Sequence, residues 1–243
     1  MKIGIIGLGN FGQFAAETLA QDASLEVVAF DANASATLKN VRIVELADVA
    51  AADAVVLCVP LSAYSSLLAE LRPLLKPETL VVDICSVKVE AEKRLRAGLP
   101  DHQNLLTTHP MFGPNSAKNG IAGLTLVVTS TDGEKAETAV QYCQDTLKLK
   151  IMRMTAEEHD QEMANVHALT FFIARGLTDT GVETSAFQPP SFQRLLDLSA
   201  LDKHHTEELF LTMEVGNPYA RSAREKFVRT LQEINDKLNK ETI

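Results

Sequence analysis

Two polar stretches of this sequence combine residue types and positions that suit catalysis. One contains Ser86 and Lys88 and follows an apolar run that ends at Asp83. The other contains His109, which also ends an apolar run and precedes a loop stiffened by two prolines and a glycine, in the order His-Pro-Met-Phe-Gly-Pro. A neutral histidine has a pKa close to neutral pH and can accept a proton from a hydroxyl group. His109 is therefore the candidate general base.

Each of these three residues also has a structural interpretation. Ser86 could be the N-cap of the next helix, Lys88 could be a solvated surface charge, and isolated histidines are often structural. For His109 the rigid loop and the position at a strand end favour a catalytic role over a structural one, because open α/β sheets bind ligands at the carboxyl ends of their strands.

The elements that would position these side chains begin at the N-terminus, where an apolar strand enters the glycine-rich turn Gly7-Leu8-Gly9-Asn10-Phe11-Gly12. In a dinucleotide-binding turn, Gly7 permits the tight bend, Gly9 lets backbone amides approach a pyrophosphate, and Gly12 lets the next helix pack closely. That helix, expected over residues 11–20, would direct its positive end at the phosphates.

A second apolar strand, residues 25–30, ends at Asp31, which follows Gly12 by 19 residues. This spacing suits the acid that binds a ribose 2′-hydroxyl. Asp31 favours NAD, because its carboxylate would repel a 2′-phosphate; NADP remains an alternative if a displaced basic side chain enters. The expected cofactor residues are Gly7, Leu8, Gly9, Asn10, Phe11, Gly12, Asp31, Val59 and Pro60.

Strand and helix patterns alternate as far as residue 154, which predicts a Rossmann-type, doubly wound, mostly parallel sheet. The segment between residues 32 and 53 is too short for a full helix and strand, so we expect its helix to be shortened or replaced by a loop. Later strands are expected at residues 54–59, 79–83, 104–108, 124–129 and 149–154, and helices at residues 62–75, 87–97 and 133–146.

Everything after Thr155 reads as helix, so we place a domain boundary there: residues 1–154 bind NAD(P), and residues 155–243 form a smaller all-helical substrate and dimerisation domain. Thr155 and Glu158 form a capping box, and the helix they open could reach Gly181, roughly 40 Å. Further helices are expected at residues 192–201 and 204–215, and a last one begins at Asn217. This last helix carries an apolar stripe that predicts a homodimer: Ala223, Phe227, Leu231, Ile234 and Leu238.

Composition narrows the class of protein. The 243 residues are 46% hydrophobic, which supports buried cores, and the net charge of −9 argues against nucleic acid or an anionic membrane as partner. The cysteines Cys58, Cys85 and Cys143 lack metal-ligand spacing, and we expect no metal. We find no export or membrane signal, and with three free thiols this favours a cytoplasmic protein.

Taken together, these motifs resemble the prephenate and arogenate dehydrogenases of tyrosine biosynthesis over nearly the whole chain. The resemblance rests on the glycine turn, on Asp83-Ile84-Cys85-Ser86-Val87-Lys88, on the stretch from Thr108 to Pro114, and on His159-Asp160. It implies an oxidative decarboxylation of prephenate or arogenate with hydride transfer to NAD(P). His109 would be the base, Ser86 would hydrogen-bond its imidazole or the substrate, and Lys88 would add positive charge near the cofactor or substrate.

The helical half departs from the family pattern. Relatives usually carry a histidine where Phe171 aligns, and His167 lies one turn earlier. A substrate-clamping arginine aligns loosely with Asp197, and Arg194 lies one turn before it. We therefore expect His167, Arg194 and Arg221 to bind substrate, although Arg221 could instead form a surface ion pair with Glu225. Arg153, Arg175 and Arg224 are further candidates for the substrate's two anionic groups.

Two rival interpretations remain. A β-hydroxyacid dehydrogenase would share this architecture but is expected to carry a catalytic lysine in the long helix, and residues 155–181 contain none. A nucleotide-binding homologue with little or no turnover is supported by Phe171 and Asp197. The choice between prephenate and arogenate stays open, because these substrates differ far from His109.

Overall fold

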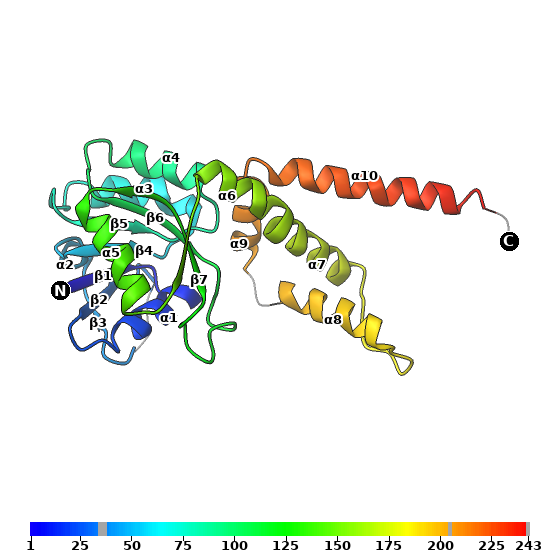
Figure 1. Ribbon diagram of the computed structural model, residues 1–243, viewed down its shortest axis with the longest axis horizontal. Coiled ribbons are helices and arrows are strands. Elements are labelled where there is room, and N and C mark those ends of the chain that lie inside the picture. Colours follow the sequence, from blue (N-terminus) through cyan, green and yellow to red (C-terminus); the bar gives the residue numbers. More distant parts are fainter. Residues whose placement is uncertain (34–37, 204–205, 242–243) are drawn as a thin grey trace. The chain divides into compact units, whose positions relative to one another are not determined.

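The computed structural model describes residues 1–33, 38–203 and 206–241 (Figure 1). The chain forms two compact units, Met1–Glu157 and Glu158–Ile243, here called the N-terminal and the C-terminal unit. The functional boundary after residue 154 stays a prediction.

An eight-stranded sheet in the order β3-β2-β1-β4-β5-β6-β7-β8 forms the centre of the N-terminal unit. Every neighbouring pair is parallel except β6 and β7, so the predicted mostly parallel α/β sheet is confirmed. The strands are β1 (Lys2–Ile6), β2 (Glu26–Phe30), β3 (Arg42–Ile43), β4 (Ala54–Leu57), β5 (Leu80–Asp83), β6 (Leu105–Pro110), β7 (Thr125–Asp132) and β8 (Lys150–Arg153).

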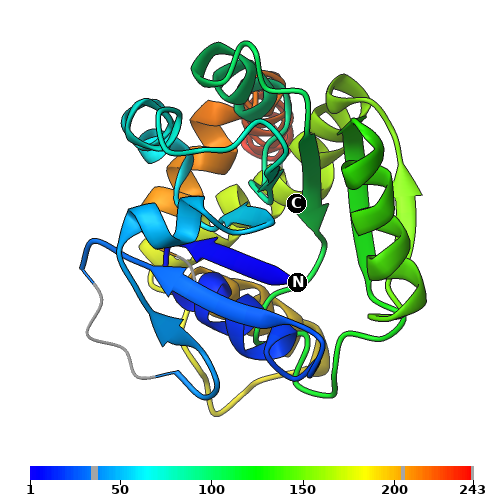
Figure 2. The same cartoon turned by 90° about the vertical axis from the view of Figure 1, so that its left-hand side faces the viewer.

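Helices cover both faces of this sheet, as Figure 2 shows. One apolar cluster joins the sheet to α1 (Asn10–Leu19) and α5 (Glu134–Asp145). A second cluster is formed by the strand side chains that point to the other face of the sheet. It joins the sheet to α2 (Leu46–Ala50), α3 (Tyr64–Leu71) and α4 (Val89–Gly98). The short 3₁₀ helix η1 (Leu61–Ala63) precedes α3. Burial on both faces explains why the strands read as continuous apolar runs.

The segment after β2 is abbreviated, as expected. Its described residues contain no helix before β3, while residues 34–37 lie outside the description. The two-residue strand β3 was not predicted, because Arg42 and Ile43 are too few to show a periodic pattern. The five-residue α2 then carries the chain back to β4.

Two expectations near the candidate site need correction. The strand predicted to end at Thr108 continues to Pro110, so His109 lies within β6. The helix predicted from residue 87 begins two residues later: α4 starts at Val89, and Lys88 rather than Ser86 occupies its N-cap position. The loop from residue 111 to residue 124 contains no helix, and β7 returns antiparallel to β6. A parallel return usually needs a crossover helix.

The described residues of the C-terminal unit form helices joined by loops, without a strand. The long helix predicted from Thr155 is interrupted by a π-helical turn, giving α6 (Ala156–Met163), η2 (Ala164–Ala168) and α7 (Leu169–Asp179). The remaining elements are α8 (Pro190–Asp202), α9 (Glu207–Leu211), the π-helical η3 (Thr212–Gly216) and α10 (Ala220–Leu238).

The start of α9 differs from the expectation. It begins at Glu207, where the Thr206 hydroxyl accepts the backbone N–H of Leu209 at 3.2 Å; the predicted start, His204, lies outside the described residues. A small core of Ala168, Phe171, Met213 and Ala220 joins η2, α7, η3 and α10. Within the described part of the chain, no helix is long and apolar enough to cross a membrane.

Candidate functional site

The predicted site residues of the N-terminal unit gather at one edge of the sheet. Parallel strands place their carboxyl ends together, so the residues that follow β1, β2, β4 and β5 meet the end of β6 there. Strand order reverses between β1 and β4, and open α/β sheets bind ligands in the crevice at such a reversal.

The glycine turn has the geometry of a phosphate cradle. Gly7 has φ +96°, and a Cβ there would lie 2.6 Å from the Cys58 carbonyl oxygen. A Cβ at Gly12 would lie 1.9 Å from the Gly7 carbonyl oxygen, so the helix can approach the turn only without a side chain. By contrast, a Cβ at Gly9 would meet nothing within 4 Å. The first and third glycines serve the fold, and the second leaves open space above the backbone.

The first turn of α1 can hold an anion. Gly9 is its N-cap residue, no side chain caps the helix, and no acidic residue lies in the first turn. Backbone N–H groups at a helix start bind phosphate well. The residues present therefore fit a dinucleotide pyrophosphate.

Asp31 lies against this turn. Its Oδ2 accepts the backbone N–H of Leu8 at 2.6 Å, and its Oδ1 accepts the N–H of Asn33 at 2.7 Å. On the other side, Val59 Cγ1 lies 2.9 Å from the position that a Gly7 Cβ would take, and Pro60 follows it. Asp31, the glycine turn and the end of β4 thus come together as the sequence predicted.

The loop that follows His109 contacts the same turn. The Phe112 ring lies 6.4 Å from Phe11 and 6.5 Å from Phe14, measured between ring centroids, and the latter two rings are 5.8 Å apart. Edge-on packing at these distances is favourable for aromatic rings. No local pattern predicts this contact, because Phe112 is about a hundred residues from the other two rings in the chain.

His109 is 5% exposed and pairs with Val127 of β7. The register of β6 and β7 shifts between Thr107 and Thr108, just before this histidine. Such irregularities redirect side chains and are frequent beside active sites. The Thr107 and Thr129 hydroxyls donate to Glu92 Oε1 of α4 at 2.7 and 2.6 Å, which holds both strands beside the irregularity.

Lys88 is not a solvated surface charge. Its side chain is fully buried and forms an ion pair with Asp83, whose side chain is also fully buried. The Lys88 ammonium group also donates to the Thr108 carbonyl oxygen, and the Tyr64 hydroxyl donates to Asp83 Oδ1. Burial and the Asp83 charge hold the pKa of Tyr64 well above its usual value and raise the pKa of Cys58 to about 12. Tyr64 therefore stays a neutral donor.

Ser86 is half-buried in the turn between β5 and α4. Asp83 of β5 pairs with Thr107 of β6. Ser86 comes shortly after Asp83 in the chain and His109 shortly after Thr107, so both residues belong to the same edge of the sheet. Asp83 and Tyr64 were missed by sequence reasoning. The acidic end of an apolar strand was a usable signal for Asp83, whereas nothing in the sequence distinguished Tyr64.

The candidate substrate residues belong to the C-terminal unit. His167 lies in η2, and its ring centroid is 5.0 Å from that of Phe171. Arg194 is exposed on α8. Arg221 is 81% exposed and pairs with Glu225 at 2.7 Å, which raises the pKa of the arginine and is the alternative that the sequence left open.

The other arginines have structural partners. Arg153 pairs with Glu137 at 2.6 Å. Arg175 pairs with Asp202 at 2.8 Å and with Glu207 at 2.9 Å, and it stacks on the Phe210 ring. Arg224 donates to the buried Glu214, whose pKa is raised by burial despite this partner.

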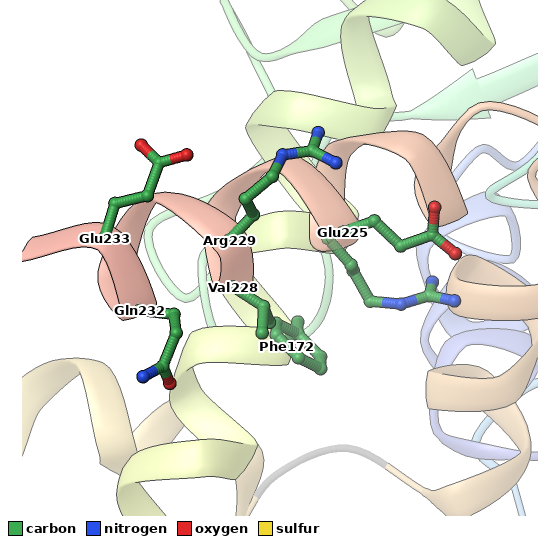
Figure 3. Close-up of a pocket in the computed structure, with 7 residues that line it drawn as sticks. Phe172, Glu225, Val228, Arg229, Gln232 and Glu233 are labelled. Atoms are coloured by element: carbon green, nitrogen blue, oxygen red, sulfur yellow. The ribbon is translucent and has the colours of Figure 1, made fainter. Parts of the chain in front are cut away.

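Two further features of the C-terminal unit frame these residues. His159 and Asp160 are fully buried, with Nδ1 of the histidine 2.8 Å from the Asp160 carboxylate. A groove of about 560 Å³ lies between α7 and α10, where Phe172 and Val228 meet below charged side chains (Figure 3). Its lining includes Arg224, one of the further arginine candidates, but not His167, Arg194 or Arg221.

Fold and site define a dinucleotide-binding α/β protein with a helical second unit. A family model described as the nucleotide-binding domain of prephenate dehydrogenase matches residues 17–154, more than half of the chain. The chain belongs to the prephenate dehydrogenase family of nucleotide-binding oxidoreductases. The match includes Asp31, Ser86, Lys88 and His109 and begins after the glycine turn.

Individual relatives agree with this assignment. The chain is 29% identical to arogenate dehydrogenase 2 of Arabidopsis thaliana, a chloroplastic protein, over 98% of this chain and 70% of the relative. It is 32% identical to the cyclohexadienyl dehydrogenase of Zymomonas mobilis, over 71% of this chain and 64% of the relative. The solved prephenate dehydrogenase of A. aeolicus, in complex with hydroxyphenyl propionate and NAD⁺, has the same fold, with a TM-score of 0.77, 18% identity, and coverage of 98% and 90%.

Proposed function

We propose that this chain catalyses the oxidative decarboxylation of prephenate or arogenate with NAD as hydride acceptor. The observation that carries the proposal is that the glycine turn, Asp31 and the strand-end His109 lie at the carboxyl edge of one sheet. The family assignment supports this reaction over that of a β-hydroxyacid dehydrogenase, as does the absence of lysine from residues 155–181.

The proposed chemistry needs one base and one hydride acceptor. His109 takes the proton of the substrate's C4 hydroxyl group. NAD, when bound, accepts the hydride from C4. As C4 becomes a carbonyl conjugated with the ring, the ring carboxylate leaves as carbon dioxide, and its bonding electrons complete the aromatic ring. Ser86, in the turn that follows the adjacent strand β5, hydrogen-bonds the imidazole or the substrate.

The substrate's anionic groups need cations. Among the predicted residues, His167 and Arg194 are the first candidates, since Arg221 already has Glu225 as partner. Arg194 is exposed, and no ion pair involving it is found among the described residues, so none would have to break when a substrate binds.

Cofactor choice follows from Asp31. Its carboxylate is anchored at the glycine turn by the Leu8 and Asn33 amides, where it would accept the ribose 2′-hydroxyl and repel a 2′-phosphate. NADP use would require a basic side chain to approach Asp31.

The predicted homodimer has support in α10. Its outer residues Val228, Leu231, Ile234 and Leu238 are 48–66% exposed and continue the apolar floor of the α7–α10 groove. Apolar residues in such a stripe normally pack against another element. A Leu231→Glu/Ile234→Glu variant should sediment as a monomer where the parent sediments as a dimer, and Lys237→Glu on the same helix is the control. Equal sedimentation of parent and variant would refute this interface.

A cytoplasmic location also stays a prediction.

The direct test is an absorbance assay for reduced nicotinamide with prephenate or arogenate, each with NAD or NADP. Turnover in an NAD pairing supports the proposal and identifies the substrate. If calorimetric titration shows NAD binding but no pairing turns over, the chain is a nucleotide-binding homologue without turnover, as Phe171 and Asp197 would suggest.

A further inference from the structure

A buried polar network includes Thr108, the residue that precedes His109 in β6. Its members are Tyr64 at the start of α3, Asp83 at the end of β5, Lys88 before α4, and Thr108 of β6. The side chains of Tyr64, Asp83 and Lys88 are fully buried, and Thr108 is 2% exposed. Groups so enclosed cannot themselves contact a substrate unless the protein opens.

Asp83 is the centre of this network. Its Oδ1 accepts the Tyr64 hydroxyl and, at 3.0 Å, the backbone N–H of Cys85, while its Oδ2 pairs with Lys88. Its backbone carbonyl accepts the Thr108 hydroxyl at 2.8 Å. The carboxylate is thus fixed from three sides, and it fixes the Lys88 ammonium group in turn.

Lys88 connects this centre to the base. Its ammonium group donates to the carbonyl oxygen of Thr108. That oxygen and the N–H of His109 belong to the same planar peptide unit. Holding the oxygen therefore fixes the plane from which the His109 side chain departs, immediately after the register shift of β6.

We propose that Lys88, held by Asp83 and Tyr64, is a positioning residue that orients His109 through the Thr108 carbonyl group and does not bind the substrate's carboxylates. This inference rests on the proposed function, since it concerns the same base. It replaces the sequence-based role of Lys88 as a positive charge near cofactor or substrate. Tyr64 acquires a role that its sequence position did not suggest.

The charge pattern agrees with this role. A lysine that recruits an anion must present an unneutralised charge, whereas Lys88 is already paired with Asp83 in a dry environment. A buried ammonium group needs its hydrogen-bond acceptors, and the structure supplies a carboxylate and a backbone carbonyl. The pair is suited to holding a backbone group in place.

Tyr64→Phe is the mildest test, because it removes one hydroxyl and leaves the charges in place. Tyr142→Phe is a matched control: that hydroxyl, on α5, also donates to an aspartate, Asp22 in the loop after α1, at 2.8 Å. We expect Tyr64→Phe to lower kcat at least fivefold, with the substrate KM and the NAD Kd within twofold of the parent. Tyr142→Phe should leave all three unchanged.

Lys88→Met tests the central residue, and the double variant Asp83→Asn/Lys88→Met serves if the single variant fails to fold, because it leaves no lone buried charge. We expect kcat to fall at least twentyfold in either, again with KM within twofold. A tenfold rise in substrate KM with kcat retained would overturn the proposal and return Lys88 to substrate binding. Parent-like kcat in Tyr64→Phe and in the double variant would also overturn it.

One readout does not need turnover. The protein is labelled with ¹³C at histidine Cε1, and the His109 signal is assigned by its loss in His109→Asn. Tyr64→Phe and the double variant should shift or broaden this signal, while Tyr142→Phe should not. An unchanged signal in both network variants would contradict positioning. Absent turnover in the parent would instead count against the proposed function alone.

Discussion

The glycine turn allows a paired prediction in which two similar substitutions fail for different reasons. Gly12→Ala places a methyl group 1.9 Å from the Gly7 carbonyl oxygen, whereas Cβ contacts under 3.0 Å essentially never occur. The helix and the turn must therefore separate by about 1 Å, and overpacking of this kind costs about 1–3 kcal/mol, sometimes more. For a unit of this size we expect Tm to fall by roughly 2–12 °C.

Gly9→Ala should behave oppositely. Its methyl group meets nothing within 4 Å, so the free energy of unfolding should change by less than about 0.5 kcal/mol. The same methyl group occupies the space through which a pyrophosphate approaches the backbone. Losing one charge-assisted hydrogen bond there costs about 1.5–3 kcal/mol, which raises the Kd for NAD roughly 10- to 100-fold.

Thermal melts and calorimetric titration with NAD measure both effects. Gly176→Ala in α7 is the control, since its Cβ also meets no atom within 4 Å. It should raise stability by about 0.5–1 kcal/mol and leave NAD affinity unchanged. The reasoning is refuted if Gly9→Ala loses stability but keeps affinity, or if Gly12→Ala melts with the parent.

Three further predictions address other parts of the molecule. Asp31→Ser should weaken NAD binding about tenfold and reduce the preference for NAD over NADP, because the carboxylate that accepts the ribose 2′-hydroxyl is lost. Titration with both cofactors measures this, and an unchanged ratio of the two affinities would contradict the role of Asp31 in cofactor choice. Glu92→Ala should lower the free energy of unfolding by about 1–3 kcal/mol in denaturant titrations, because the Thr107 and Thr129 hydroxyls lose their shared acceptor; parent-like stability would show that these bonds contribute little. Burial raises the pKa of Glu214 in the folded protein above its value in the unfolded chain, so the free energy of unfolding falls as the pH rises from the unfolded to the folded pKa. The difference in Tm between Glu214→Gln and the parent should therefore increase between pH 4 and pH 7. A difference that stays constant would contradict this.

The sequence was most informative where local chemistry determines structure. Three glycines, an apolar strand before them and Asp31 after the next strand predicted the edge of the sheet that the structure forms. These features depend on neighbouring residues and on one short crossover. The strand patterns were also legible, because both faces of the sheet are buried.

The sequence was less informative where distant residues decide the outcome. The environment of Lys88 depends on Tyr64, Asp83 and Thr108, which three separate elements contribute. The antiparallel return of β7 depends on a loop without helix, and the π-helical turns η2 and η3 have no simple periodic signal. Tertiary packing determines these features.

The most direct test of the central claim compares His109→Asn with the parent in two measurements on the same preparation. We expect the variant to bind NAD with the parent's affinity in calorimetric titration, because His109 does not belong to the glycine turn. Its turnover of prephenate or arogenate should fall by about 10²- to 10⁴-fold, the usual contribution of a general base. Turnover within tenfold of the parent's would contradict the assignment of His109 as the base.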